Sequence, residues 1–177
     1  MTGVVVFTAG REDAYEDYKR SVRDGHPIED YDQYLNERTA ERLLDAYPDG
    51  IAHVWGTSVE NTWNYVEPGD IALVYRDGGF ITRADVLSTE QNYDFAEEIF
   101  NFEGNPWDPE NPWEYLVYLT DIEEIEVSLQ EFNALFDYQD DYYPQGFTRV
   151  ADFRIENVAE QHESVETALA DLTDTGR

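Results

Sequence analysis

The sequence predicts a single α+β domain, a small β-barrel of about six strands surrounded by short helices. Runs of β-branched and aromatic residues recur along the chain, and short segments with helical spacing of apolar residues lie between them. This order favours a mixed barrel over a doubly wound parallel sheet. A length of 177 residues suits one domain, and a hydrophobic content of 41% suffices for a core. We assign residues 1–155 to the domain and residues 156–177 to a polar C-terminal helix and tail.

The first third of the chain begins with a strand and continues mainly with helices. Val4–Thr8 is a β-branched and aromatic run that predicts a strand. Apolar residues at helical spacing predict a helix over Arg11–Arg23 and one or two helical pieces over Asp30–Ala46. Ile51–Trp55 predicts the second strand, and Thr62–Val66 predicts a short helical turn.

The middle of the chain predicts a β-hairpin. Ile71–Arg76 and Phe80–Leu87 are strand-like runs, and Asp77–Gly78–Gly79 between them is a tight-turn signal. A further helical turn is expected at Ala96–Phe100. The prolines of Asn105–Pro112 then predict a loop.

The last third adds three strand-like runs: Tyr115–Leu119, Ile122–Val127 and Phe147–Arg154. Ser128 is followed three residues later by Glu131, which is the spacing of a capping box and predicts a helix ending near Asp137. Val158–Leu172 predicts a polar helix with a thin apolar stripe.

The charge of the chain is extreme. Asp and Glu number 40 against 11 Lys and Arg, so the formal net charge is −29, and Lys19 is the only lysine. This pattern is typical of proteins from cells with molar salt, where the Debye length is about 3 Å. The acidity therefore indicates habitat and not partner. In such salt, nucleic-acid binding would depend on stacking, hydrogen bonds and shape, because counterion release contributes little.

The sequence carries no enzymatic or membrane signature. It has no cysteine, no Gly-rich phosphate loop, no Gly-x-Ser-x-Gly elbow, and three histidines without metal spacing. No apolar run approaches the roughly 18 residues of a membrane span, and the N-terminus lacks the regions of a signal peptide. We therefore expect no catalytic residue, no metal, no cofactor, no membrane partner and a cytoplasmic location.

The tryptophans are the most informative residues. Trp107 lies in the proline-rich loop, where a tryptophan either covers the core or forms a stacking wall for a flat ligand. Trp113 precedes a strand, and we interpret it as core. We favour the ligand-binding interpretation for Trp55 and Trp107. His53 lies two residues before Trp55 on a strand and therefore shares its face, and its simplest interpretation is a half-buried residue bonded to the backbone.

Several segments together resemble the PUA-like superfamily, whose nearest branches are the EVE and YTH domains. They are Val54–Ser58, Asn61, Val66–Tyr75, Asn111–Leu119 and Tyr143–Phe147. EVE-like domains also form the modified-DNA reader of McrB-type restriction proteins. The resemblance spans about residues 4–150, and it implies a closed barrel with a pocket for a modified base that is flipped out of its strand.

The resemblance also implies site residues. The nucleobase-binding candidates are Trp55, Trp107, Thr57, Ser58, Asn61, Thr8 and His53. Trp55 matches the first tryptophan of the YTH cage, and Trp107 lies in the loop that would supply a second aromatic. Thr8–Ala9–Gly10 replaces the Lys-Ser-Asn-like triplet of YTH domains. The modified base could therefore be N6-methyladenine or a cytosine derivative.

Phosphate contacts require cations, and Arg11, Arg76 and Arg83 are the candidates. Arg76 and Arg83 flank the turn of the predicted hairpin. Arg11 begins a segment that holds four of the basic residues, interleaved with acids. The simplest interpretation of that segment is a solvated, ion-paired helix.

The leading hypothesis is a non-catalytic reader of a modified, methylated base on DNA or RNA. It would act alone or as the recognition module of a restriction-like defence system, with an effector nuclease or NTPase as partner. One alternative is a small-molecule or protein-interaction module with no nucleic-acid role. Another is a Mg²⁺-dependent hydrolase or nuclease. Whether Trp55 and Trp107 converge on an open pocket distinguishes the first two.

Overall fold

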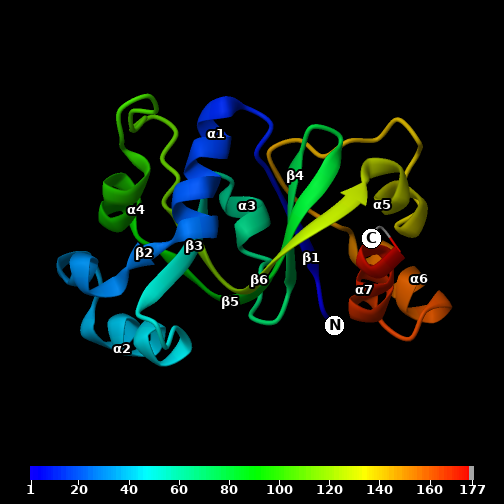
Figure 1. The fold of residues 1–177 in the computed structure, drawn as a ribbon, viewed down its shortest axis with the longest axis horizontal. Coiled ribbons are helices and arrows are strands. Elements are labelled where there is room, and N and C mark those ends of the chain that lie inside the picture. Colours follow the sequence, from blue (N-terminus) through cyan, green and yellow to red (C-terminus); the bar gives the residue numbers. More distant parts are fainter. Residues whose placement is uncertain (176–177) are drawn as a thin grey trace.

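The computed structural model describes residues 1–175 and shows one mixed sheet with helices around it (Figure 1). The strands are β1 (Val4–Thr8), β2 (His26–Pro27), β3 (Ile51–Thr57), β4 (Ile71–Arg76), β5 (Gly79–Gln91), β6 (Tyr115–Ser128) and β7 (Phe147–Arg149). Their order in the sheet is β2-β3-β6-β5-β4-β1-β7. β1 and β4 are parallel, and the other neighbours are antiparallel. The α+β class predicted from the sequence is confirmed.

The helices are short. They are α1 (Glu12–Asp17), α2 (Glu37–Ala46), α3 (Glu60–Trp63), α4 (Tyr93–Phe100), α5 (Leu129–Leu135), α6 (Asp152–Gln161) and α7 (Val165–Thr175). The chain also forms a π-helix, η1 (Tyr18–Asp24), and a 3-10 helix, η2 (Ile28–Tyr34). α5, α6 and α7 lie at one end of the sheet, and α2 and α4 lie at the other (Figure 1). None of the helices within residues 1–175 has the length and apolar character needed to cross a membrane.

The sheet is strongly curled. The register of the long β5–β6 pair shifts at three places, and such bulges bend and twist strands. The rings of Phe7 on β1 and Trp55 on β3 have centroids 5.5 Å apart, although three strands separate β1 from β3 in the sheet. The strand pairing nevertheless ends at β2 and at β7. The closed barrel expected from the sequence is therefore not confirmed, and the structure has a curled, open sheet instead.

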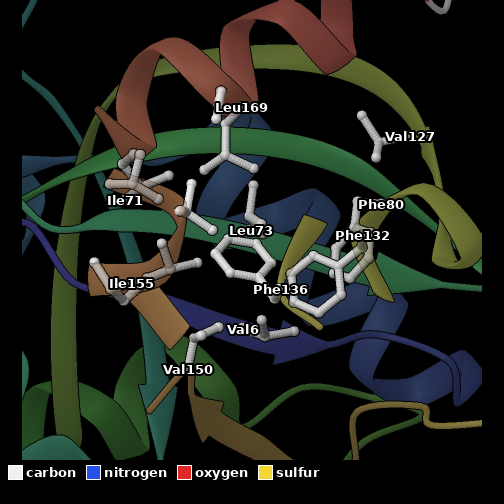
Figure 2. Close-up of a cluster of buried hydrophobic side chains, with 14 residues drawn as sticks. Val6, Ile71, Leu73, Phe80, Val127, Phe132, Phe136, Val150, Ile155 and Leu169 are labelled. Carbon is white, nitrogen blue, oxygen red and sulfur yellow. The ribbon is translucent and has the colours of Figure 1, made fainter. Parts of the chain in front are cut away.

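Successive side chains of each strand point to opposite faces of the sheet, which divides the core into layers. Val5 and Phe7 of β1 join the cluster inside the curl, together with Trp55. Val4 and Val6 point to the opposite face of the sheet, which α5, α6 and α7 cover. Figure 2 shows that second layer, with Leu169 of α7 facing Ile71 and Leu73 of β4. A third cluster lies beneath α4, α2 and η2.

The Pro68–Gly69–Asp70 turn has a structural role. Asp70 is only 3% exposed, and its two carboxyl oxygens accept hydrogen bonds from the backbone N–H groups of Gly3 at 2.8 Å and Glu67 at 2.9 Å. Gly69 has a φ of +92°, which favours glycine. This motif, part of the resemblance to PUA-like domains, therefore joins the start of β1 to the start of β4.

Two strand predictions near the C-terminus are wrong. The chain forms one strand, β6, where the sequence predicts two, because Asp121 with a φ of +52° makes a bulge and the pairing with β5 continues beyond it. The last strand stops at Arg149, where the sequence predicts Arg154. Asp152 begins α6, and its carboxylate accepts a hydrogen bond from Arg149 at 2.7 Å.

The C-terminal region consists of two helices where the sequence predicts one over Val158–Leu172. The side chain of Ser164 accepts a hydrogen bond from the backbone N–H of Thr167 at 3.0 Å, so a new helix begins there. The boundary proposed between residues 155 and 156 falls within α6. Both helices bury apolar side chains, among them Ile155, in the cluster shown in Figure 2.

Candidate functional site

A pocket of about 640 Å³ opens where α1 meets two loops. Its walls come from the turn after β1, from α1, from the 101–114 loop and from the 136–146 loop. α1 and the loop after α4 rise on the same side of the molecule (top of Figure 1). Five aromatic residues line it: Tyr75, Phe100, Trp107, Trp113 and Tyr143. This volume lies within the usual range of small-ligand sites, about 300–1,000 Å³.

Trp107 is held in the pocket wall by hydrogen bonds from both of its N–H groups. Its backbone N–H donates to the side chain of Asn101 at 3.0 Å, and its indole N–H donates to the hydroxyl of Tyr93 at 3.1 Å. The rings of Tyr93 and Trp107 meet edge to face, with centroids 5.3 Å apart. A half-buried tryptophan that is fixed in this way presents a rigid aromatic surface to the pocket.

The second tryptophan of the wall is Trp113, which the sequence interprets as core. It is half-buried, and its ring packs edge to face against Phe100 at 5.7 Å. Trp55 is 3% exposed and is not part of the pocket lining, although the sequence predicts it as the first base-binding residue. Its ring lies 5.8 Å from that of Trp113, so Trp55 supports the wall from inside the sheet.

Gly56 allows this packing. A Cβ atom at position 56 would lie 2.6 Å from the ring of Phe100 and 2.7 Å from the carbonyl oxygen of Trp113. Both neighbours line the pocket, and the second contact is with backbone that has little freedom to move. The glycine that follows Trp55 in sequence is therefore required for the close approach of the wall to β3.

We expect Gly56→Ala to lower the free energy of unfolding by about 1–3 kcal/mol, because the added methyl overpacks the site. Gly10→Ala is the matched control, since a Cβ there meets nothing within 4 Å. Urea unfolding of both variants in molar KCl measures the difference. Equal unfolding midpoints for Gly56→Ala and the unaltered protein would show that the wall moves without penalty.

Asp17 is the most unusual polar residue of the pocket. It is 1% exposed, and one carboxyl oxygen, Oδ2, accepts a hydrogen bond from the side-chain amide of Asn105 at 2.7 Å. The other oxygen, Oδ1, is buried without a hydrogen-bond partner among the described residues. Burial raises the pKa of this carboxyl to about 7, against the opposing effects of Arg20 and of the Asn105 hydrogen bond.

Sequence reasoning misses Asp17 because 40 acidic residues hide it. The spacing of residues along the helix does, however, indicate that Asp17 is buried. Asp17 and Tyr18 lie three and four residues after Ala14, which is buried like Tyr18, so Asp17 lies on an apolar face of the helix. A carboxylate on such a face is rarely buried without a reason.

The structure places Thr8 and Arg11 in the pocket lining with Trp107. The hydroxyl of Thr8 donates to the carbonyl oxygen of Gly146 at 2.9 Å, which joins β1 to the 136–146 loop. Arg11 is 85% exposed at the side chain and pairs with Asp13 at 2.7 Å. Its guanidinium is therefore at the rim and open to solvent.

Four other predicted base-binding residues lie outside the pocket lining: His53, Thr57, Ser58 and Asn61. His53 donates from Nδ1 to the carbonyl oxygen of Val22 at 2.6 Å, which agrees with its simplest interpretation. The buried hydroxyl of Thr57 accepts from the backbone N–H of Val59 at 3.0 Å and starts the turn into α3. Asn61 is exposed on α3.

The other two phosphate candidates are also placed elsewhere. Arg76 donates to the carbonyl oxygen of Ala9 at 2.7 Å, and its guanidinium lies 3.7 Å from the ring centroid of Tyr15. Arg83 lines a small hollow with Leu169 of α7, on the opposite side of the sheet from the curl. Within residues 1–175, no cluster of three or more His, Asp or Glu side chains is arranged to hold a metal ion.

Comparisons with known proteins identify the fold. The sequence matches no protein-family model and no curated protein. The solved structure of the N-terminal domain of McrB from Thermococcus gammatolerans, bound to m5C DNA, is similar to this chain with a TM-score of 0.68 and 17% identity. The match covers 90% of this chain and 96% of that one. Human THYN1 protein in complex with 5-methylcytosine-containing DNA matches with a TM-score of 0.42 and 12% identity, over 90% of this chain and 97% of that one. The fold is therefore shared with the McrB domain, as the sequence resemblance implies.

Proposed function

We propose that this protein is a non-catalytic reader of modified DNA that accepts a flipped 5-methylcytosine in the pocket between α1 and its two loops. The observation that carries the proposal is the open aromatic pocket, which contains a buried carboxyl group. The fold supports it, because the McrB domain with the same fold is bound to m5C DNA. Of the two modified bases that the sequence leaves open, we therefore favour the cytosine derivative.

The energetics of base flipping fit this pocket. Extruding a base costs a few kcal/mol. Stacking of a base on an aromatic side chain contributes about 1–3 kcal/mol, and burial of one methyl group adds about 0.8 kcal/mol. Trp107 and Trp113 line the pocket, and Tyr143 at its edge is 55% exposed. Two stacking contacts and the methyl group are enough to offset extrusion.

Charge predicts an unusual dependence on salt. Asp13, Asp17 and Asp108 line the pocket against the single cation Arg11, and the chain carries a net charge of −29. Repulsion from DNA phosphates is therefore strong at low ionic strength and screened at high ionic strength. We expect the affinity for methylated DNA to hold or rise between about 0.2 M and 2 M KCl, whereas a protein with many phosphate contacts loses affinity.

Tryptophan fluorescence tests the proposal directly, because two tryptophans line the pocket. Matched duplexes carrying 5-methylcytosine, N6-methyladenine or no modified base are titrated at about 2 M KCl. We expect quenching by the 5-methylcytosine duplex at the lowest concentration. Equal responses to all three duplexes would exclude base reading. No response from the folded protein would instead favour a small-molecule or protein-interaction module.

The proposal extends to a partner protein. A reader recognises a mark and leaves the action to a partner, such as an effector nuclease or NTPase of a restriction-like defence system. The acidic composition fits the cytoplasm of a cell with molar salt.

A further inference from the structure

The pocket holds a buried oxygen that nothing in the described part of the protein satisfies. Asp17 lines the pocket, and its Oδ1 has no hydrogen-bond partner, whereas Oδ2 is held by Asn105. We propose that Asp17 reads position 4 of the flipped base and selects 5-methylcytosine against thymine. This inference rests on the proposed function and adds a specificity-determining residue to it.

Discrimination against thymine is a necessary property of such a reader. Thymine carries the same methyl group at C5 as 5-methylcytosine and stacks equally well on aromatic rings. A pocket made only of Trp107, Trp113 and their neighbours would therefore bind every thymine in DNA. The two bases differ at position 4, where cytosine has an amino donor and thymine has a carbonyl acceptor.

The hydrogen-bonding capacity of Asp17 matches this difference. Asn105 donates to Oδ2 at 2.7 Å and fixes the carboxyl group from one side. The remaining oxygen, when ionised, accepts hydrogen bonds only. It can accept from the amino group of 5-methylcytosine and repels the carbonyl oxygen of thymine. An unsatisfied buried acceptor is costly, so a ligand that supplies the missing donor recovers that free energy.

The charges around Asp17 set the pH at which this selection operates. On its own helical segment, Asp13 and Glu16 favour the neutral carboxyl, and Arg20 favours the ionised one. From the loops, Asn105 donates to it, and Asp108 lines the same pocket, as does Arg11 of the preceding turn. Burial is the largest effect and raises the pKa to about 7. Below that pH a neutral carboxyl can donate to thymine, so the preference for 5-methylcytosine should grow as pH rises through about 7.

Asp17→Asn is the informative substitution. The amide of Asn105 requires an acceptor, so the new side chain is expected to turn its oxygen toward Asn105 and its NH₂ group toward the base. That group donates to the carbonyl of thymine and opposes the amino group of cytosine. We expect the affinity for 5-methylcytosine to fall about tenfold or more, and the affinity for thymine to stay constant or rise.

The experiment compares oligonucleotides in which 5-methylcytosine, cytosine or thymine lies opposite an abasic site. None of the three bases then loses a pairing partner on flipping. Affinities are measured at about pH 6 and about pH 8.5, on either side of the pKa of Asp17. Glu12→Gln is the matched control, because it removes the same charge from the same helix at an exposed residue outside the pocket lining.

The outcomes separate the two proposals. Unaltered protein that fails to prefer 5-methylcytosine over cytosine overturns the proposed function. Unaltered protein that prefers 5-methylcytosine, with Asp17→Asn keeping the same preference over thymine, overturns only the role of Asp17. The role stands if Asp17→Asn loses the preference and its dependence on pH, while Glu12→Gln retains both.

Discussion

Trp107→Ala is expected to weaken binding of 5-methylcytosine DNA by about tenfold to a hundredfold while leaving the protein folded. The indole lines the pocket and is anchored by Tyr93 and Asn101, so it offers a fixed surface for stacking. Loss of one base–aromatic stack removes about 1–3 kcal/mol. The affinity is measured by fluorescence titration in molar KCl, where Trp113 still reports on the pocket.

Trp55→Ala, in contrast, should lower the stability of the folded protein. Trp55 is 3% exposed and packs against Phe7 and Trp113 inside the curled sheet. Removal of a buried tryptophan side chain costs about 3–5 kcal/mol of stability.

Trp107→Phe is the conservative control for Trp107→Ala, since it keeps an aromatic face and should retain most of the affinity. Binding by Trp107→Ala equal to that of the unaltered protein would show that the base lies elsewhere.

Asp17→Asn is expected to stabilise the folded protein at about pH 8 by a few kcal/mol. The pKa of Asp17 is raised from 3.8 to about 7 in the folded state, chiefly by burial. Between these two values the folded protein binds more protons than the unfolded chain. The contribution of Asp17 to the free energy of unfolding is therefore largest below about pH 4. It falls as the pH rises toward 7 and stays low above that pH. Asparagine carries no charge at any of these pH values, so the variant does not lose this stability as the pH rises.

Urea unfolding at about pH 4, 6 and 8 measures this effect. The difference in free energy of unfolding between Asp17→Asn and the unaltered protein should be small at the lowest pH and should increase as the pH rises. Glu12→Gln tests the contribution of net charge alone, because Glu12 is exposed on the same helix. A difference that is constant with pH would show that Asp17 stays ionised throughout. A variant that is more stable yet less selective would indicate that the buried carboxyl is retained for binding.

Local signals in the sequence predict most of the elements correctly. The β-branched run at Val4–Thr8 forms β1 with the predicted bounds, and the turn at residues 77–79 joins β4 to β5. Ser128 caps α5 by accepting from the backbone N–H of Glu131 at 3.1 Å, as the capping-box spacing predicts. The errors arise where a local signal has two meanings. Asp121 resembles a turn in sequence, but it forms a bulge because β5 is long enough to pair on both sides of it.

The sequence by itself determined the α+β class, the position of most strands and helices, the acidic and aromatic character, and the resemblance in fold. It also named Trp107, Thr8 and Arg11 as site candidates, and all three line one pocket. Each of these follows from residue type, spacing or motif.

Only the tertiary structure decided which tryptophan faces the pocket and which supports it. Trp55 is buried and Trp113 lines the pocket, although their sequence contexts suggest the reverse placement, because the curl of the sheet buries β3 and leaves the edge of the 101–114 loop open. Burial raises the pKa of Asp17, and its carboxyl group accepts a hydrogen bond from Asn105, which is 88 residues away in the chain. Burial and charge environment depend on segments that are distant in sequence and adjacent in space, and no local pattern encodes that proximity.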